Sequence, residues 1–291
     1  MKLARFTHQG RTRVGAVVDD RIVDGALDPE LPQDMPALLQ SGKEGRRRLL
    51  ELAADQAHCL PLSEVRLEAP IARPGKYLAI SLNYSDHINE TGFEPPEFPS
   101  FFNKQSTCVI GPGSPIHRPR VSEKLDYEGE LAVVIGRRCR HVPADRAREV
   151  IGGFTVANDV SVRDWQIRSP TFTLGKSFDT HGPIGPWIVT PDEIPDPHDL
   201  RVRTWVSGDL RQDFNTGGQI FDIYHQIETL STVCTLESGD IIATGTGSGV
   251  GVKMKPRGYM QPGDVVRIEI AQVGALENPV VEEPEDTAFI D

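Results

Sequence analysis

The amino-acid sequence predicts a mainly β protein of the α+β class. The chain of 291 residues carries many short apolar or alternating runs that end at glycine, proline or aspartate, and it has few segments with helical spacing. Its length suits one large domain or one domain with a small appendage. The composition, 38% hydrophobic and 25% charged, is typical of a globular protein.

The first seventy residues are expected to form a small α/β domain. Alternation within residues 2–26 predicts a meander of short strands, and recurring leucines within residues 34–58 predict helix. Gly42 and Gly45 are expected to divide that segment into two helices. A proline-containing linker follows, so we place a domain boundary near residue 70 and assign residues 71–291 to the main domain.

The segment most informative about function starts with two carboxylates, Glu128 and Glu130, which precede the apolar run Leu131–Ile135. Residues two apart on a strand point to the same side. A third carboxylate, Asp159, ends another apolar run. One interpretation is a solvated strand face, since charged side chains are mostly exposed. The other is an oxygen-rich site suited to Mg²⁺, Mn²⁺ or Ca²⁺.

Two further positions are candidates for catalysis. His87 and Glu90 lie three apart, so on one helical turn they face the same side, as in a general base oriented by a carboxylate. The alternative is a surface turn in water. Lys176 lies between Gly175 and Ser177 in an uncharged neighbourhood, which favours either a buried cation with an anionic partner or an exposed loop lysine.

Two segments are expected to be loops beside a site. Residues 93–100 contain three prolines and form a candidate lid. The glycine-rich run of residues 241–251 follows a strand, but it lacks the Gly-Lys-Ser/Thr ending of a phosphate-binding loop, so we reject nucleotide binding. Backbone amides around Thr246 could still bind a carboxylate.

Charge and cysteine content exclude several classes of protein. The net charge of −11 argues against nucleic acid or an anionic membrane as the main partner. The four cysteines form no CxxC pair and indicate free thiols in a reducing compartment. The sequence contains no apolar run long enough for a transmembrane helix, and its start lacks the apolar core of a signal peptide. We therefore expect a cytoplasmic protein.

Several motifs, in this order, resemble those of the fumarylacetoacetate hydrolase family. The resemblance covers roughly residues 70–281, and residues 1–70 resemble the small domain of the longer bacterial members. The motifs are Leu-Asn-Tyr-Ser-Asp-His, Asp-Tyr-Glu-Gly-Glu-Leu-Ala, Asn-Asp-Val-Ser-Val-Arg-Asp, Gly-Lys-Ser-Phe-Asp-Thr and Thr-Gly-Thr-x-x-Gly-Val-Gly.

The resemblance implies a mixed β-sandwich roll, a homodimer and a small-molecule keto-acid or diketone substrate. It also implies Mg²⁺ or Mn²⁺, and sometimes Ca²⁺, held by two Glu and one Asp. The implied metal ligands are Glu128, Glu130 and Asp159; the implied catalytic residues are His87, Glu90 and Lys176; the implied substrate-binding residues are Arg163, Gln166 and Thr246. Proline usually follows that threonine in the family, whereas this chain has Gly247, which leaves the carboxylate pocket uncertain.

The reaction that the resemblance implies is metal-dependent hydrolysis of a C–C bond in a β-diketone or an acylpyruvate-type 2,4-diketo acid. Hydrolysis needs an activated water, and His87 with Glu90 could supply it. The alternatives are an oxaloacetate-type decarboxylase and a hydroxymuconate- or hydroxyheptadienedioate-type isomerase on the same site. A non-catalytic binding protein of the same fold is a further alternative.

Overall fold

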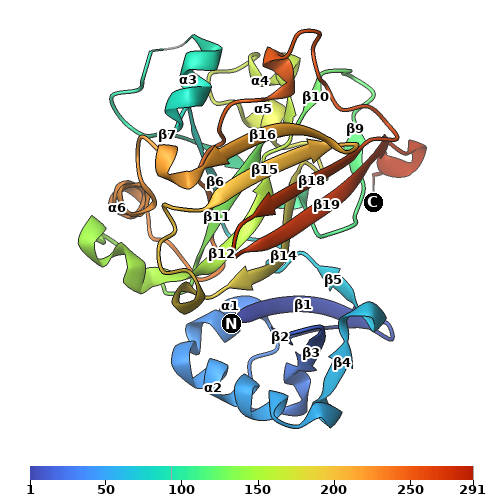
Figure 1. Cartoon of the computed structure of the whole chain (residues 1–291), viewed down its shortest axis with the longest axis vertical. Coiled ribbons are helices and arrows are strands. Elements are labelled where there is room, and N and C mark those ends of the chain that lie inside the picture. The colour runs from blue at the N-terminus through green and yellow to red at the C-terminus, as the bar shows by residue number, and fades with distance from the viewer. Residues whose placement is uncertain (93, 291) are drawn as a thin grey trace.

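The computed structural model describes residues 1–92 and 94–290, and its largest feature is a sheet of twelve strands (Figure 1). Ten strands follow the order β4-β3-β2-β1-β14-β12-β11-β17-β6-β7, while β5 pairs with β1 and β8 pairs with β14. The bounds are β1 (Lys2–His8), β2 (Arg11–Val18), β3 (Arg21–Asp24), β4 (Cys59–Pro61), β5 (Arg66–Glu68), β6 (Tyr77–Ser81), β7 (Ser100–Lys104), β8 (Val109–Ile110), β11 (Gly129–Ile135), β12 (Ile151–Asn158), β14 (Gly182–Val189) and β17 (Ile241–Ala243).

A second sheet of five strands, in the order β16-β15-β18-β19-β9, crosses in front of β11 and β12 (Figure 1). Its strands are β9 (Ile116–Arg118), β15 (Arg201–Val206), β16 (Asp209–Asn215), β18 (Val265–Ile270) and β19 (Gly274–Glu282). A two-stranded pair, β10 (Leu125–Asp126) with β13 (Ser161–Val162), lies beside it. The expectation of a mainly β protein with few helices is confirmed.

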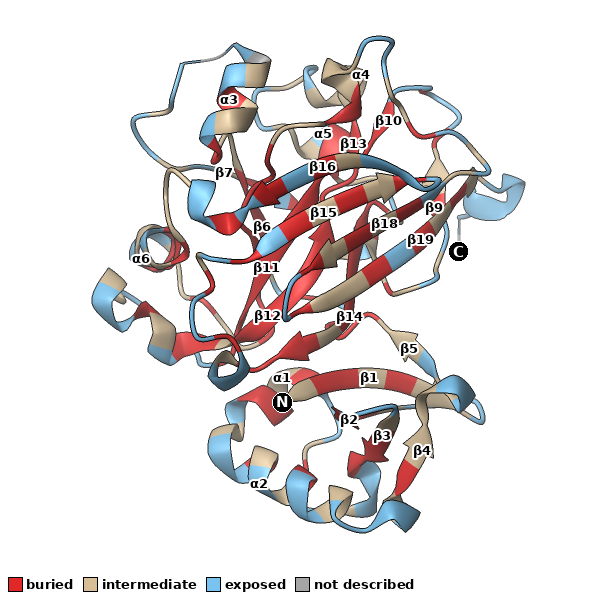
Figure 2. Cartoon of the chain, viewed as in Figure 1, coloured by how far each residue is buried: buried red, intermediate tan, exposed pale blue. Residues whose placement is uncertain are grey.

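Strand β11 is buried on both faces, which explains its unbroken apolar run (Figure 2). Leu131, Val133 and Ile135 belong to the core between the two sheets, which also contains Val202 and Ile268. Ala132 and Val134 point to the other face of the large sheet and join a second core there. The strand therefore carries its first residues, and Glu128 just before them, into the middle of the molecule.

The N-terminal segment extends the large sheet, because β1 pairs antiparallel with β14. The predicted meander is present as β1, β2 and β3, and the predicted helices are α1 (Met35–Gln40) and α2 (Gly42–Ala53). The break falls at Gly42 as expected. Gly45 is instead inside α2, where a Cβ would lie 1.8 Å from Ser41 Oγ, so close packing accounts for this glycine. The domain boundary near residue 70 stays a prediction.

The remaining α-helices are short and lie around the sheets (Figure 1). They are α3 (Ser85–Thr91), α4 (Arg163–Gln166), α5 (Thr173–Lys176) and α6 (Ile223–Val233). Phe93, the first residue of the predicted lid loop, lies outside the described residues. Within the described part of the chain, no helix is long and apolar enough to cross a membrane.

Candidate active site

Antiparallel pairing of β11 with β12 brings the three predicted carboxylates together. Gly129 pairs with Asn158, so the residues just outside this pair, Glu128 and Asp159, face each other, and the Asp159 amide donates to the Glu128 carbonyl at 2.9 Å. Glu130 points to the same side as Glu128. One oxygen from each carboxylate of Glu128, Glu130 and Asp159 lies within 4.8 Å of the others, and all three side chains are buried.

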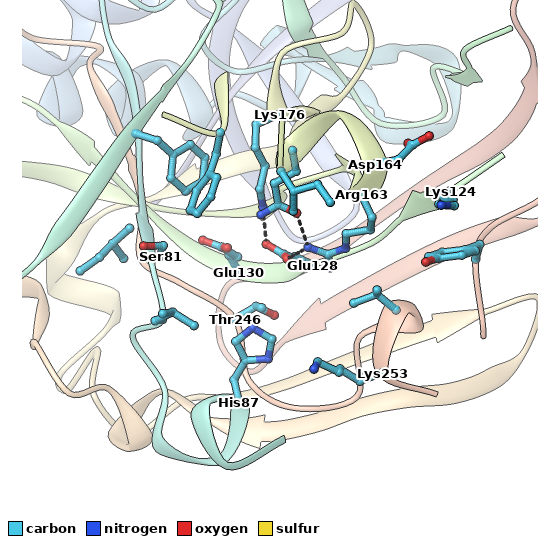
Figure 3. A pocket seen from close by; sticks show the side chains of 18 residues that line it. Ser81, His87, Lys124, Glu128, Glu130, Arg163, Asp164, Lys176, Thr246 and Lys253 are labelled. Atoms are coloured by element: carbon cyan, nitrogen blue, oxygen red, sulfur yellow. Dashed lines mark hydrogen bonds and ion pairs between the residues drawn. The ribbon is translucent and has the colours of Figure 1, made fainter. Parts of the chain in front are cut away.

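Two buried lysines contact these carboxylates. Lys176 Nζ donates to Glu128 Oε2 at 2.7 Å and to Asp159 Oδ2 at 2.6 Å (Figure 3 shows the first of these contacts). Its side chain is 3% exposed, so the alternative of a solvated loop lysine is wrong. Lys104 Nζ donates to Asp159 Oδ1 at 2.6 Å and also to the Lys176 carbonyl. Asp159 is thus held through both oxygens.

The electrostatics of the three carboxylates differ. Burial alone would raise the pKa of Glu128, but the charges of Lys176 and Arg163 outweigh burial and hold that pKa below its usual value. Burial, together with the neighbouring Asp159 and Glu128, raises the pKa of Glu130 well above its usual value. Burial opposes the charge on Lys176, yet Asp159 and Glu128 outweigh it and raise the pKa of the lysine.

This donor set fits a divalent cation. The oxygens of three buried carboxylates converge, and this is the ligand type that Mg²⁺, Mn²⁺ and Ca²⁺ prefer. Glu130 makes no ion pair among the described residues; its Oε2 accepts from the Gly245 amide at 2.7 Å. A cation at this position would relieve the repulsion that raises the pKa of Glu130.

His87 and Glu90 lie on α3, and His87 lines the same pocket from the opposite side (Figure 3). His87 Nδ1 lies 3.4 Å from Glu90 Oε2, and the two side chains are only 12% and 23% exposed. A carboxylate beside Nδ1 assigns the proton to that nitrogen, which leaves Nε2 as the free base. The pair is therefore a partly buried dyad rather than a turn in open water.

The glycine-rich run anchors the helix that carries this dyad. The Ser248 amide donates to Asp86 Oδ2 at 3.1 Å, and the Gly249 amide donates to Glu90 Oε1 at 3.1 Å. The Gly251 amide donates to Asp126 Oδ1 at 2.8 Å. The predicted anion-binding amides thus exist, but those of residues 245, 248, 249 and 251 bind carboxylates of the protein itself.

The three predicted substrate-binding residues border the same pocket. Arg163 Nη1 lies 2.6 Å from Glu128 Oε1 and donates to Gln166 Oε1 at 3.0 Å. Arg163, the first residue of α4, thus contacts a carboxylate directly, and it also contacts Gln166 at the end of the same helix. Thr246 Oγ1 donates to the Gly129 carbonyl at 2.9 Å and accepts from Gln212 Nε2 at 2.8 Å. Thr246 is therefore fixed against the start of β11.

The pocket has a volume of about 490 Å³. Seven of the nine predicted site residues line it: His87, Glu128, Glu130, Arg163, Gln166, Lys176 and Thr246. The other two contact lining residues, since Glu90 pairs with His87 and Asp159 pairs with Lys176.

Sequence reasoning missed three buried polar residues that hold this site together. They are Lys104, which contacts Asp159; Asp126, which accepts from Arg163 Nε at 2.8 Å; and Gln212, whose Oε1 accepts from the Gly129 amide at 3.0 Å. A signal existed for Lys104, since it points to the same side of β7 as the buried Phe102. Gln212 carried the same kind of signal, since it points to the same side of β16 as the buried Phe214, but nothing local indicated that this side faces the start of β11.

Comparison with known proteins agrees with this geometry. The family model for the C-terminal domain of fumarylacetoacetate hydrolase matches residues 76–281. The chain is 40% identical, over 288 residues, to the mitochondrial oxaloacetate tautomerase of Xenopus laevis, and the match covers 97% of this chain and 90% of that protein.

Two solved structures share the fold over nearly the whole chain. The maleylpyruvate hydrolase of Sphingobium sp. SYK-6, in complex with manganese(II) and pyruvate, is 37% identical with a TM-score of 0.81, covering 98% of this chain and 100% of that one. The 2-hydroxyhepta-2,4-diene-1,7-dioate isomerase of Mycobacterium marinum is 33% identical with a TM-score of 0.79 and the same coverage.

The fold and the buried carboxylate site define an enzyme superfamily that acts on small molecules, with tautomerases, isomerases and hydrolases among its members. Within it, this chain belongs to the fumarylacetoacetate hydrolase family.

Proposed function

We propose that this protein enolises a 2-oxo acid, in the manner of an oxaloacetate tautomerase. The observation that carries the proposal is that His87, which pairs with Glu90, lines the same pocket as Glu128, Glu130 and Lys176, and that Lys176 contacts Asp159. The 40% identity to an oxaloacetate tautomerase across 97% of the chain supports tautomerisation over the other reactions of the family.

Glu128, Glu130 and Asp159 would hold Mg²⁺ or Mn²⁺. A divalent cation in such a site polarises a carbonyl oxygen and offsets negative charge that develops on it. The manganese(II) in the maleylpyruvate hydrolase structure supports this choice of metal. Lys104 and Lys176 would keep Asp159 oriented toward the cation, as outer partners of metal ligands commonly do.

The dyad would transfer the proton. His87 Nε2 takes a proton from carbon 3 of the 2-oxo acid, the C–H electron pair forms the C2–C3 double bond, and the carbonyl π electrons move to the oxygen on carbon 2. Glu90 keeps Nδ1 protonated and stabilises the imidazolium that results. Lys176 provides a buried positive charge beside the developing oxyanion; water protonates that oxygen to complete the enol, and the His87 imidazolium returns its proton to the hydroxide that is left.

The three relatives suggest the substrate class. Oxaloacetate, maleylpyruvate and hydroxyheptadienedioate are 2-oxo or 2-hydroxy acids that carry a second carboxylate. The proposed substrate is therefore such a diacid. The homodimer and the cytoplasmic location stay predictions, which sedimentation and cell fractionation would test.

The test follows the enol form of oxaloacetate by its ultraviolet absorbance in the presence of Mg²⁺. The wild type is expected to speed its conversion to the keto form, and His87→Asn to lose at least about 100-fold in kcat, a typical contribution of general acid–base catalysis. His225→Asn is the matched control, because His225 also pairs with an acid three residues away, Asp222 at 3.0 Å, but on the exposed face of α6. Equal rates in the wild type and His87→Asn would overturn the proposal.

A second candidate is the predicted C–C hydrolysis of an acylpyruvate. The 37% identity to a maleylpyruvate hydrolase with bound pyruvate favours it, since pyruvate is the fragment that such a cleavage releases. In this reaction the same dyad takes a proton from a water, which attacks the distal carbonyl carbon. The C3–C4 bond then breaks, its electron pair forms the enolate of pyruvate, and the proton held by His87 returns to carbon 3. Oxygen-18 from water in the released carboxylic acid would identify hydrolysis, whereas tautomerisation leaves the carbon skeleton intact.

A further inference from the structure

The pocket has a cationic side that the proton transfer does not use. Lys124 and Lys253 line it together with Arg163, and in Figure 3 both lie on the Arg163 side of Glu128, whereas Ser81 lies on the other side. Two lysine side chains therefore lie beside Arg163 on one side of the pocket.

Arg163 adds an unused hydrogen-bond donor to this side. Its Nε bonds Asp126 and its Nη1 bonds Glu128 and Gln166. Its Nη2 is buried, and within the described chain it has no hydrogen-bond partner. A buried guanidinium nitrogen without an acceptor is costly, so an acceptor oxygen from a ligand would satisfy it.

One buried carboxylate fixes the backbone that carries these cations. Asp126 accepts from the Gly251 amide at 2.8 Å and from the Val252 amide at 2.9 Å, and it also accepts from Arg163 Nε. The loop that contains Lys253 closes on itself through the Gly258 amide, which donates to the Gly251 carbonyl at 2.9 Å.

The backbone of Lys124 is tied to the same frame. The Arg163 amide donates to the Lys124 carbonyl at 3.0 Å, and the Met260 amide donates to the Leu125 carbonyl at 2.9 Å. The backbones of residues 124, 163 and 253 are therefore held in one rigid unit, so the three side chains start from fixed positions on one side of the pocket.

The local charge is opposite to that of the whole chain. The net charge is −11, yet Lys255 and Arg257 continue the cationic loop outward, and Arg120 borders a neighbouring hollow with Lys124. Acids are present as well. Glu90 and Glu123 border those outer hollows, and Asp164 lines the pocket, where its Oδ1 accepts from Ser122 Oγ at 2.6 Å. Positive charge gathered at the mouth of a pocket concentrates anions there.

We propose that Lys124 and Lys253, together with Nη2 of Arg163, bind the second carboxylate of a 2-oxo diacid whose 2-oxo carboxylate end lies at Glu128, Glu130 and Asp159. This proposal rests on the proposed function, because it takes the 2-oxo acid end from it. It adds the residues that select diacids over monoacids. The volume of about 490 Å³ leaves room for chains longer than that of oxaloacetate.

The experiment compares acids that differ only at the far end. 2-Oxoglutarate and 2-oxovalerate form one pair, and 2-oxoadipate and 2-oxohexanoate form a longer pair; in each, a carboxylate replaces a methyl group. Binding to the Mg²⁺-loaded protein is measured by calorimetry, so turnover is not required. The wild type is expected to prefer the diacid of at least one pair by about tenfold or more, the usual effect of charged hydrogen bonds.

The double variant Lys124→Met/Lys253→Met keeps Arg163, and it is expected to lose most of that preference while it keeps its affinity for the monoacids. Lys255→Met is the matched control, because Lys255 is on the same loop but does not line the pocket; it should keep the preference. Equal binding of diacid and monoacid by the wild type, or an unchanged preference in the double variant, would overturn this proposal alone. If the wild type binds none of the four acids, the proposed function falls together with it.

Discussion

Gly247, which follows Thr246 at the pocket, is the position where a single added methyl group should be most informative. An ideal Cβ there would lie 2.4 Å from Cγ and 2.6 Å from Cδ1 of Phe214. Phe214 is itself buried and packs edge-on against Tyr84, with ring centroids 5.0 Å apart. Carbon atoms without a bond prefer a separation of about 3.5–4.0 Å, so the ring would have to move by roughly 1 Å.

Gly247→Ala is therefore expected to lower the free energy of unfolding by about 1–3 kcal/mol, the usual cost of overpacking a buried site. At this chain length that corresponds to a melting temperature lower by roughly 2–6 °C. Phe214→Ala removes the two atoms that clash most. In its background the added Cβ still meets the Cβ of residue 214 at 2.9 Å, so the same Gly247→Ala change should cost less than in the presence of the ring, which a double-mutant cycle measures directly.

Urea-induced unfolding of the four proteins in this cycle provides the free energies. Gly218→Ala is the milder control, because its added Cβ would lie 3.3 Å from the nearest atom, Tyr84 Cδ1. The reasoning is refuted if Gly247→Ala costs the same with and without the Phe214 ring. Such a result would mean that the glycine serves the loop backbone rather than the packing of Phe214.

Three further predictions concern buried charged or titratable groups. Burial lowers the pKa of His181 to about 3, so between about pH 6.5 and pH 3 the unfolded chain binds more protons and stability falls with falling pH. His181→Gln should remove about 2 kcal/mol of the stability lost between pH 6.5 and pH 5; an unchanged slope in urea unfolding would contradict this. Lys104→Met should lower the free energy of unfolding of the metal-free protein by about 3 kcal/mol or more, because among the described residues Asp159 would then pair with Lys176 alone. No loss in urea unfolding would show that Lys104 contributes nothing to Asp159. Lys176→Met should lower kcat by about 100-fold or more while Mn²⁺ still binds in calorimetry, and a kcat near that of the wild type would exclude Lys176 from charge stabilisation.

The sequence predicted those parts of the site that depend on strand geometry. Glu128 and Glu130 converge because strand residues two apart share a side. Asp159 was grouped with them because it ends another apolar run and by the family resemblance, while its antiparallel pairing through β12 and β11 came from the structure. The burial of β11 on both faces was readable from its unbroken apolar run. Helical spacing placed His87 and Glu90 on one side, and the family resemblance selected them as a catalytic pair.

The parts that the sequence did not predict depend on contacts between distant segments. Gln212 reaches Thr246 from a strand of the other sheet, and Asp126 holds a loop that follows it by more than a hundred residues. The need for a glycine at position 247 also comes from a residue distant in the sequence, Phe214. Its departure from the family pattern suggested a change in the carboxylate pocket, whereas the structure places the Phe214 ring where a Cβ would be. No local spacing encodes such a neighbour.

The central claim is that Glu128, Glu130 and Asp159 hold a divalent cation that, together with His87, promotes proton transfer at carbon 3 of a 2-oxo acid. The most direct test is the rate of deuterium exchange at carbon 3 of oxaloacetate in D₂O with Mg²⁺, measured by NMR for the wild type and Glu130→Gln, alongside Mn²⁺ affinity by calorimetry. The account predicts rapid exchange and Mn²⁺ binding by the wild type, and the loss of both in the variant. Equal exchange rates for the two proteins, above the rate without enzyme, would contradict it.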